Sequence, residues 1–271
     1  MNQPDYIYIF NDFTDTGNDV RMIIPSSGKC NRVQANINER DFIRRRQRSK
    51  FPAIIADLID LAVSVWLADW LSKQRGGRQY KIRIELPVRH PEILGGTDSI
   101  KMLTKTMRWY TEDNWEFVFH KRIASPRRAE SQPLCLPDDS PVEVALWSGG
   151  LDSFAGAFNR ISDSSEKDFT LFGTGSNKNS FGVQKELADI LKPCLGTNLK
   201  YMRLPFSVSN AKKIKKNRLL RSRGFTNVLL GVACACLENQ NYLYIYENGI
   251  GAINLPYTEA EAGLDHSRAV H

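Results

Sequence analysis

A strand, a glycine turn and a helix follow one another near the middle of the chain, and this succession constrains the fold more than any other stretch. Residues 142–147 (VEVALW) are apolar or β-branched enough for a buried strand. Residues 148–153 (SGGLDS) then place two glycines where the chain must turn tightly. The helix that follows carries four apolar side chains on one face, Phe154, Ala157, Phe158 and Ile161. This geometry presents backbone N–H groups and a positive helix end to an anion, so it predicts a phosphate-binding loop.

Strands and helices alternate from residue 142 onward. The pattern predicts strands at 142–147, 168–175, 199–206 and 242–249, with helices at 152–161, 180–191 and 224–238 between them. Such alternation is typical of an α/β domain in which helices cover both faces of a parallel sheet. Ligands bind these sheets at the carboxyl ends of the strands. We therefore expect the residues that follow the strands to form one site.

Small and polar residues follow the first two strands. Ser148 and Ser153 supply hydroxyl donors to the predicted phosphate loop. Asp152 can cap the helix or reach a phosphate-bound Mg²⁺, because hard cations favour carboxylate oxygens. Gly175 lies in a turn of small residues, which can pass close to a flat ring.

Charged residues follow the third and fourth strands. Arg221 and Arg223 precede or open a helix, where guanidinium groups neutralise the charge that builds on ATP phosphates in a transition state. Glu247 and Asn248 end the fourth strand. One carboxylate can accept hydrogen bonds from both the N1–H and the 2-amino group of a guanine-like ring. The alternative for Glu247 is that it fixes the turn or holds Mg²⁺.

The sequence predicts a smaller α+β module over residues 1–123, without regular alternation. Its strands are expected at 6–10, 20–25, 79–88 and 115–120, and its helices at 51–74 and 100–110. In the long helix Asp57, Asp60 and Ser64 form a narrow polar stripe, so most of its circumference should be buried. Residues 124–141 concentrate proline, serine and charge and are predicted to be a linker to an ATP-binding domain at 142–271.

The net charge of +7 is concentrated in two runs, at residues 40–50 and 212–223. Such runs suggest phosphate-bearing partners, although a solvated basic face is the commoner explanation of any one run. We expect Arg44 to Arg48 to lie on the first module and to contact a partner or solvent. The lysines at 212–216 are expected to form a solvated loop.

The five cysteines are scattered and form no CxxC pair, which suits a reducing cytoplasm and predicts no structural zinc. The first residues, MNQPDYIYIF, do not have the pattern of a signal peptide. The longest apolar stretch, residues 51–71, contains three aspartates, which disfavours a membrane span. We expect a cytoplasmic protein that does not enter a membrane.

Four segments together resemble the PP-loop ATP pyrophosphatases: SGGLDS, RSRGF at 221–225, ENGIGAINLP at 247–256, and HSRAVH at 266–271. The likeness covers residues 142–271. It is greatest to the branch related to 7-cyano-7-deazaguanine synthase (QueC-like), particularly the longer versions in bacterial antiphage defence operons such as the Qat systems. The resemblance implies an adenine nucleotide α-hydrolase-like fold. It also implies a ligase that cleaves ATP to AMP and pyrophosphate while it activates a deazapurine carboxylate.

With this resemblance, the candidate site residues fall into three groups. The ATP and Mg²⁺ site comprises Ser148, Gly149, Gly150, Leu151, Asp152, Ser153, Gly175 and Arg221, with Asp152 as the metal ligand. The catalytic roles go to Asp152, Ser153 and Arg223. The deazapurine-like substrate is assigned to Glu247, Asn248, Arg268 and His271.

The sequence departs from the synthase in two ways. It lacks the C-terminal cysteine cluster that binds zinc, and it stops at His271, where relatives run on into further helices. The last domain is therefore expected to be a truncated or a naturally short form. The resemblance leaves ammonia, another amine, a partner protein of a defence operon and a nucleic acid as candidate acceptors of the activated carboxylate.

Two other functions remain open. One is a tRNA-modifying PP-loop enzyme, whose basic runs would hold a phosphate backbone. The sequence lacks a recognisable RNA-binding motif, so nucleic acid is not the favoured partner. The other is a nucleotide-sensing subunit of a defence complex, which would bind ATP without turnover and dock through its first module.

Overall fold

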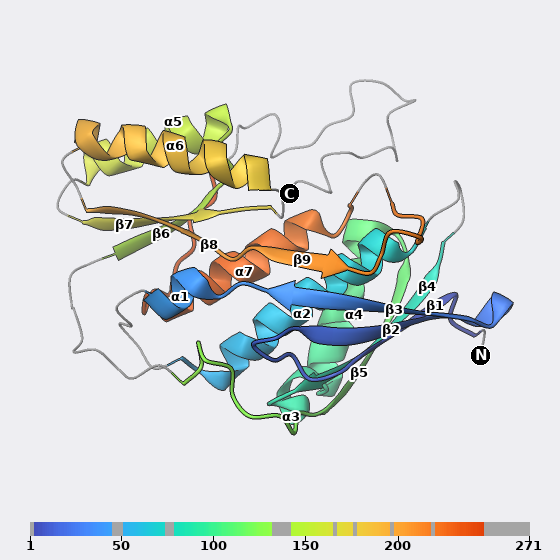
Figure 1. The fold of residues 1–271 in the computed structure, drawn as a ribbon. Coiled ribbons are helices and arrows are strands. Elements are labelled where there is room, and N and C mark those ends of the chain that lie inside the picture. Colours follow the sequence, from blue (N-terminus) through green and yellow to red (C-terminus); the bar gives the residue numbers. More distant parts are fainter. Residues whose placement is uncertain are drawn as a thin grey trace.

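The computed structural model describes residues 3–44, 51–73, 79–131, 142–164, 167–175, 178–195, 198–217 and 220–246. Within these residues the chain forms two sheets, a mixed sheet of six strands and a parallel sheet of three (Figure 1). The predicted α/β class is confirmed at this level.

The larger sheet has the strand order β5-β4-β1-β2-β3-β9. Its strands are β1 (Tyr6–Phe10), β2 (Asn18–Ile24), β3 (Lys29–Ile37), β4 (Lys81–Val88), β5 (Asn114–Lys121) and β9 (Phe206–Ser209). β1, β4 and β5 are parallel, whereas β2, β3 and β9 are added antiparallel. The helices of this part are α1 (Arg40–Arg44), α2 (Ala53–Leu71), α3 (Pro91–Leu94) and α4 (Thr97–Thr111). α2 and α4 lie against one face, and Figure 1 shows no described helix over the other.

The prediction for this region omitted β3. The inward side of this strand is apolar only at Val33, Ala35 and Ile37, while its outward side carries residues such as Arg32 and Gln34. The alternation is confined to residues 32–37, because residues 29–31 (KCN) are mostly polar, and this short pattern was not recognised as a strand. The four strands that were predicted here are confirmed.

The smaller sheet contains β6 (Val142–Trp147), β7 (Asp168–Gly173) and β8 (Leu199–Arg203), all parallel. α5 (Leu151–Asp163) and α6 (Lys178–Leu195) cover one face, and α7 (Arg223–Leu237) packs on the other (Figure 1). The predicted fourth strand is reduced, among described residues, to one parallel bridge between Tyr244 and Ala145. Tyr244 is therefore next to β6, on the side away from β7.

The strand predicted at 199–206 is wrong in its second half. β8 ends at Arg203, and after Pro205 the chain enters β9, which pairs with β3 of the other sheet. Proline lacks the N–H that a continued ladder would need, and its carbonyl oxygen instead accepts a 2.7 Å bond from the N–H of Asn38. One sheet thus contains strands from both sides of the predicted linker.

Residues before and after the predicted linker also share one apolar core. The rings of Trp66 and Phe206 meet edge to face with centroids 4.9 Å apart, and Phe42 stacks on Phe172 at 6.3 Å. Residues 124–131 pack onto the first module instead of running free, because Arg127 is 2% exposed and bound to carboxylates there.

α2 is buried around nearly its whole circumference, as predicted. Its polar stripe does not face solvent, since Asp57, Asp60 and Ser64 are all fully buried, as is Asp69 near the other end of the helix. Buried carboxylates must find partners, and each of these binds groups from other elements. No described helix has the length and apolarity needed to cross a membrane.

Candidate functional site

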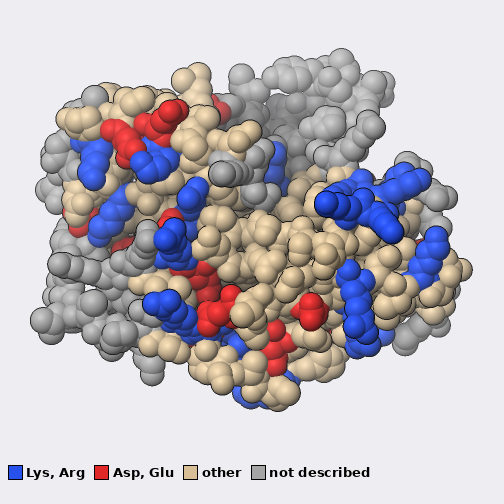
Figure 2. All heavy atoms as spheres, viewed as in Figure 1, with Lys and Arg blue, Asp and Glu red and all other residues tan. Residues whose placement is uncertain are grey.

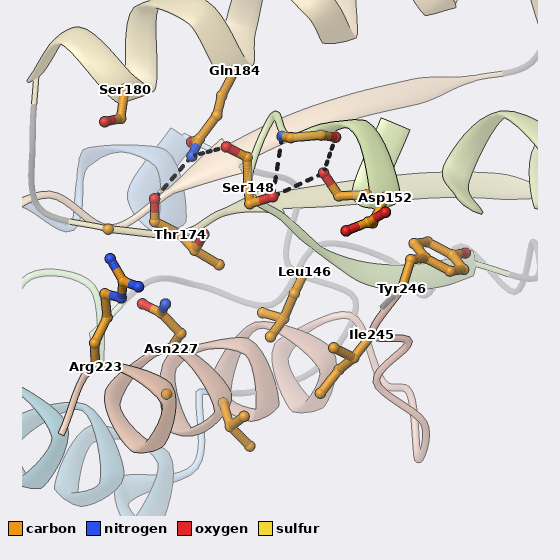
Figure 3. Close-up of a pocket in the computed structure, with 15 residues that line it drawn as sticks. Leu146, Ser148, Asp152, Thr174, Ser180, Gln184, Arg223, Asn227, Ile245 and Tyr246 are labelled. Carbon is orange, nitrogen blue, oxygen red and sulfur yellow. Dashed lines mark hydrogen bonds between the residues drawn. The ribbon is translucent and has the colours of Figure 1, made fainter. Parts of the chain in front are cut away.

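A pocket of about 610 Å³ opens at the carboxyl ends of β6 and β7 (Figure 3). Along β6, Ala145 and Trp147 pack with α5 and α6, while Val144 and Leu146 pack with α7. On one side of β6 the sheet continues with β7, and on the other side lies the segment at Tyr244. A parallel sheet has a natural crevice at such a switch point, and the volume lies in the range of small-molecule sites.

The glycines of the SGGLDS turn fix its shape. Gly149 has a φ of +74°, and a Cβ added there would lie 3.1 Å from Cγ of Gln184. A side chain at this position would strain the backbone and crowd α6. Gly150 is the N-cap of α5, so the turn leads directly into the helix. Gly149 shapes the turn from behind, whereas Gly150 lines the pocket.

The two serines of the turn hold it closed. Oγ of Ser148 accepts a 3.1 Å hydrogen bond from the N–H of Gly150 and lies 3.0 Å from Oγ of Ser153. Ser153 donates to the carbonyl oxygen of Gly150 at 2.9 Å. Ser153 is 4% exposed, whereas Ser148 is exposed, and both line the pocket. A bound anion would therefore meet the hydroxyl of Ser148 first.

The first turn of α5 supplies an acidic side chain and main-chain donors. Asp152 is exposed and lines the pocket (Figure 3). Leu151 is 81% exposed and is not among the lining residues, so its predicted role reduces to its main-chain N–H. The first N–H groups of an α-helix have no acceptor within the helix. No group of three or more His, Cys, Asp or Glu side chains suited to a metal occurs in the described part of the chain.

Gln184 joins the ends of β6 and β7 and was missed by the sequence analysis. Its Nε2 donates to the carbonyl oxygens of Ser148 (3.1 Å) and Thr174 (2.9 Å), and its Oε1 accepts from the hydroxyl of Tyr201 (3.0 Å). The side chain is 1% exposed. A signal was present, because Gln184 is a polar residue at an inward position of α6, between Phe181 and Ala188.

The start of α7 forms the opposite wall of the pocket. Arg223, Gly224 and Asn227 line it, and Arg223 is exposed with no ion-pair partner among the residues that the structure describes. Arg223, which was predicted to act on bound phosphate, therefore lies on a wall of this pocket. Asn227 was missed, because an isolated asparagine inside an apolar helix carries no distinctive pattern.

The structure places Arg221 differently from the prediction. Its Nη2 lies 2.5 Å from Oδ2 of Asp113, a buried carboxylate just before β5, and it does not line the pocket. Burial raises the pKa of Asp113 to about 6, although the charge of Arg221 acts to lower it. The predicted contact between Arg221 and a phosphate is therefore replaced by an ion pair with the first module.

A second buried carboxylate holds the residue between the two arginines. Oδ2 of Asp69 accepts hydrogen bonds from the N–H (2.9 Å) and the hydroxyl (2.8 Å) of Ser222. Burial raises the pKa of Asp69, and the bonds from Ser222 oppose this rise. Asp69 and Asp113 together fix the first turn of α7, and so the position of Arg223.

The rest of the pocket is apolar and aromatic. Leu146, Val228 and Ile245 line it together with Tyr246, whose ring lies against α5. A Cβ on Gly156 would lie 2.4 Å from Cγ of Tyr246, so only glycine permits this approach. Burial raises the pKa of Tyr246 to about 12, which keeps its hydroxyl neutral. Gly175, predicted to contact the nucleotide, has a φ of +103° and lines the pocket.

The remaining predictions for the site cannot be placed. The proposed substrate residues Glu247, Asn248, Arg268 and His271 lie outside the described residues, as do residues 45–50 of the first basic run. Comparison of the chain with models of protein families, with curated proteins and with solved structures gave no match.

Proposed function

We propose that the pocket binds ATP, with the triphosphate against the turn at 148–153 and the start of α7. The observation that carries this proposal is the meeting of two helix N-termini and Arg223 at one pocket. Each N-terminus bears partial positive charge and amide groups without an acceptor in the helix. A polyphosphate offers the charge and the many acceptor oxygens that such a wall can satisfy.

Asp152 is the residue that would hold Mg²⁺. Magnesium in nucleotide sites takes one or two carboxylates together with phosphate oxygens and waters, so one exposed carboxylate beside the phosphate turn is sufficient. The metal would neutralise phosphate charge. Arg223 would contribute a second, fixed positive charge from the other wall.

The reaction we propose is adenylation of a carboxylate. A carboxylate oxygen attacks the α phosphorus of ATP, the bond between that phosphorus and the bridging oxygen to the β phosphate breaks, and pyrophosphate leaves. An amine or ammonia then attacks the acyl adenylate, forming an amide and releasing AMP. The resemblance of SGGLDS to PP-loop enzymes supports this cleavage site, and a deazapurine carboxylate is the substrate that the QueC-like branch suggests.

Analysis of nucleotide products tests the chemistry. The purified chain is incubated with ATP, Mg²⁺ and a carboxy-deazaguanine, and the products are identified by mass spectrometry. We expect AMP and pyrophosphate. ADP would contradict adenylation, and tight ATP binding without any product would favour the nucleotide-sensing subunit.

Matched variants test the binding site by calorimetry with ATP and Mg²⁺. Arg223→Gln should weaken ATP binding by roughly 10- to 100-fold, corresponding to the ~1.5–3 kcal/mol of a hydrogen bond to a charged group. Arg108→Gln removes one exposed charge from α4 and serves as its control. Asp152→Asn should remove the Mg²⁺ dependence, whereas Asp163→Asn, at the other end of α5, should not. Unchanged affinity in both Arg223→Gln and Asp152→Asn would contradict the proposed site.

A further inference from the structure

The uncovered face of the larger sheet carries a group of cations at one end. β2 and β3 pair so that Arg21 lies directly opposite Arg32, and both are exposed. Residues directly opposite in a sheet point to the same face. β9 forms the edge beside β3, and the loop that follows it carries four exposed lysines, Lys212, Lys213, Lys215 and Lys216. We call these six side chains the basic face.

Figure 2, viewed as Figure 1, shows blue atoms gathered where the chain leaves β9, with further blue atoms below them over the end of β3. The sequence contains no carboxylate between Asp189 and Glu238. Asp19 is the one acidic residue among the outward positions of β2. None of the six cations has an ion-pair partner among the described residues, so the charge of the basic face is not balanced from within that part of the chain.

The arrangement is unfavourable without a bound anion. Like charges directly opposite in a sheet destabilise it, and Arg21 and Arg32 occupy such a pair. Four lysines within five residues add further repulsion. An anion with many closely spaced charges would relieve both, because each phosphate contact also releases a counterion from the anion.

The aromatic side chains near the basic face indicate which class of polyanion would bind there. Nζ of Lys216 lies 4.4 Å from the centre of the Trp70 ring, so this ring is already covered by a cation. The outward residues of β2 and β3 include no aromatic side chain. Proteins that bind single strands stack bases on exposed rings, and the basic face has no such platform among its described residues.

We propose that the basic face binds the phosphodiester backbone of duplex nucleic acid without reading its sequence. Lysine ammonium groups on long stems suit contacts with successive phosphates, and the two arginines can each grip one phosphate with paired donors. The basic face is separate from the residues that line the pocket, so the proposal does not rest on ATP binding.

Fluorescence anisotropy with the full chain and a labelled DNA duplex of mixed sequence tests this at several salt concentrations. The native chain should bind, and its affinity should fall steeply with salt. Replacing Lys212, Lys213 and Lys215 by glutamine should weaken binding by on the order of tenfold or more and reduce the salt slope by about 3, one unit for each lost phosphate contact. Lys216 is kept because it packs on Trp70.

A matched control removes three exposed charges from α4, as Lys101→Gln, Lys105→Gln and Arg108→Gln together. This triple variant should bind the duplex as the native chain does. The double variant Arg21→Gln, Arg32→Gln provides an independent test and should also weaken binding. The proposal fails if the native chain does not bind at low salt, if the control loses as much affinity as the lysine variant, or if single-stranded DNA or polyglutamate binds more tightly than the duplex.

Discussion

The two ends of α2 use buried aspartates for different purposes. Near the N-terminal end, Asp60 binds the guanidinium groups of both Arg89 and Arg127, and Asp57 binds Arg89 as well. These contacts join α2 to Arg89 of the first module and to Arg127 of the segment that packs onto it. Near the C-terminal end, Asp69 accepts two hydrogen bonds from Ser222, beside the pocket.

The two ends of α2 differ in the groups that bind their aspartates. Glu39 and Glu130 complete the N-terminal cluster by binding Arg127 and Arg89, so each charge there compensates others. Burial raises the pKa of Glu39, against the attraction of Arg127. At the other end the donors are a neutral hydroxyl and a main-chain N–H. Loss of one member should therefore be costly for stability at the first end, and costly for the pocket at the second.

The largest effect is expected at Arg127. Arg127→Ala leaves Glu39 buried without its guanidinium partner and removes one of the two guanidinium groups that bind Asp60, so the free energy of unfolding should fall by about 3–5 kcal/mol. Urea unfolding measures this. Arg128→Ala changes the exposed neighbour and should alter the same quantity by less than about 0.5 kcal/mol. Equal effects of the two variants would show that the cluster is not a stabilising unit.

The next effect is expected at Asp69. Asp69→Ala removes the acceptor of a buried N–H and hydroxyl, which should cost about 1–3 kcal/mol of unfolding free energy and also weaken ATP binding through Arg223. Asp69→Asn keeps a carbonyl oxygen and should restore most of the affinity. The proposed difference between the two ends of α2 is contradicted if Arg127→Ala weakens ATP binding as much as Asp69→Ala does, with both variants measured at a temperature where they are folded.

A smaller effect, dependent on pH, is expected from Asp113. Its pKa is about 6 in the folded chain, above the ~3.9 of an unfolded aspartate, so the folded state holds the proton more tightly. The free energy of unfolding should therefore decrease as pH rises from about 4 to about 6. Asp113→Asn should remove about 1–2 kcal/mol of this dependence. Parallel stability curves of the native chain and the variant would contradict the raised pKa.

The smallest effect on stability is expected for an ion pair that is exposed to solvent. Lys185 and Asp189 lie 2.5 Å apart on α6, with side chains 64% and 59% exposed. Lys185→Ala should change the unfolding free energy by only about 0.2–0.5 kcal/mol, and salt should abolish the difference. If Lys185→Ala lowered the unfolding free energy as much as Arg127→Ala, burial would not explain why the ion pairs of the buried cluster contribute more.

The sequence was sufficient for features that depend on neighbours in the chain. The turn at 148–153 was predictable because a buried strand, two glycines and an amphipathic helix are contiguous. It was not sufficient to separate Arg221 from Arg223. That distinction depends on Asp113, which is 108 residues away from Arg221 and becomes its neighbour only in the fold.

Long-range contacts also explain the other omissions. Gln184 owes its position to carbonyl oxygens at the ends of two strands, and Asp69 owes its role to the start of a helix 153 residues later. The inward position of Gln184 on α6 indicates a buried polar group but does not identify its partners, and nothing near Asp69 in the chain points to Ser222. The division of the strand at 199–206 had a local signal in Pro205, but the partner of the second half, β3, was not predictable from that proline.

The position of β9 has a consequence for synthesis of the chain. Gln34 of β3 faces Ser209, which the ribosome adds 175 residues later. Throughout that interval the edge of β3 presents unsatisfied N–H and C=O groups to any other extended segment. Contacts between residues so far apart in the chain also form slowly. The nascent first module therefore passes through a stage that needs protection from wrong pairing, and its own later strand ends that stage.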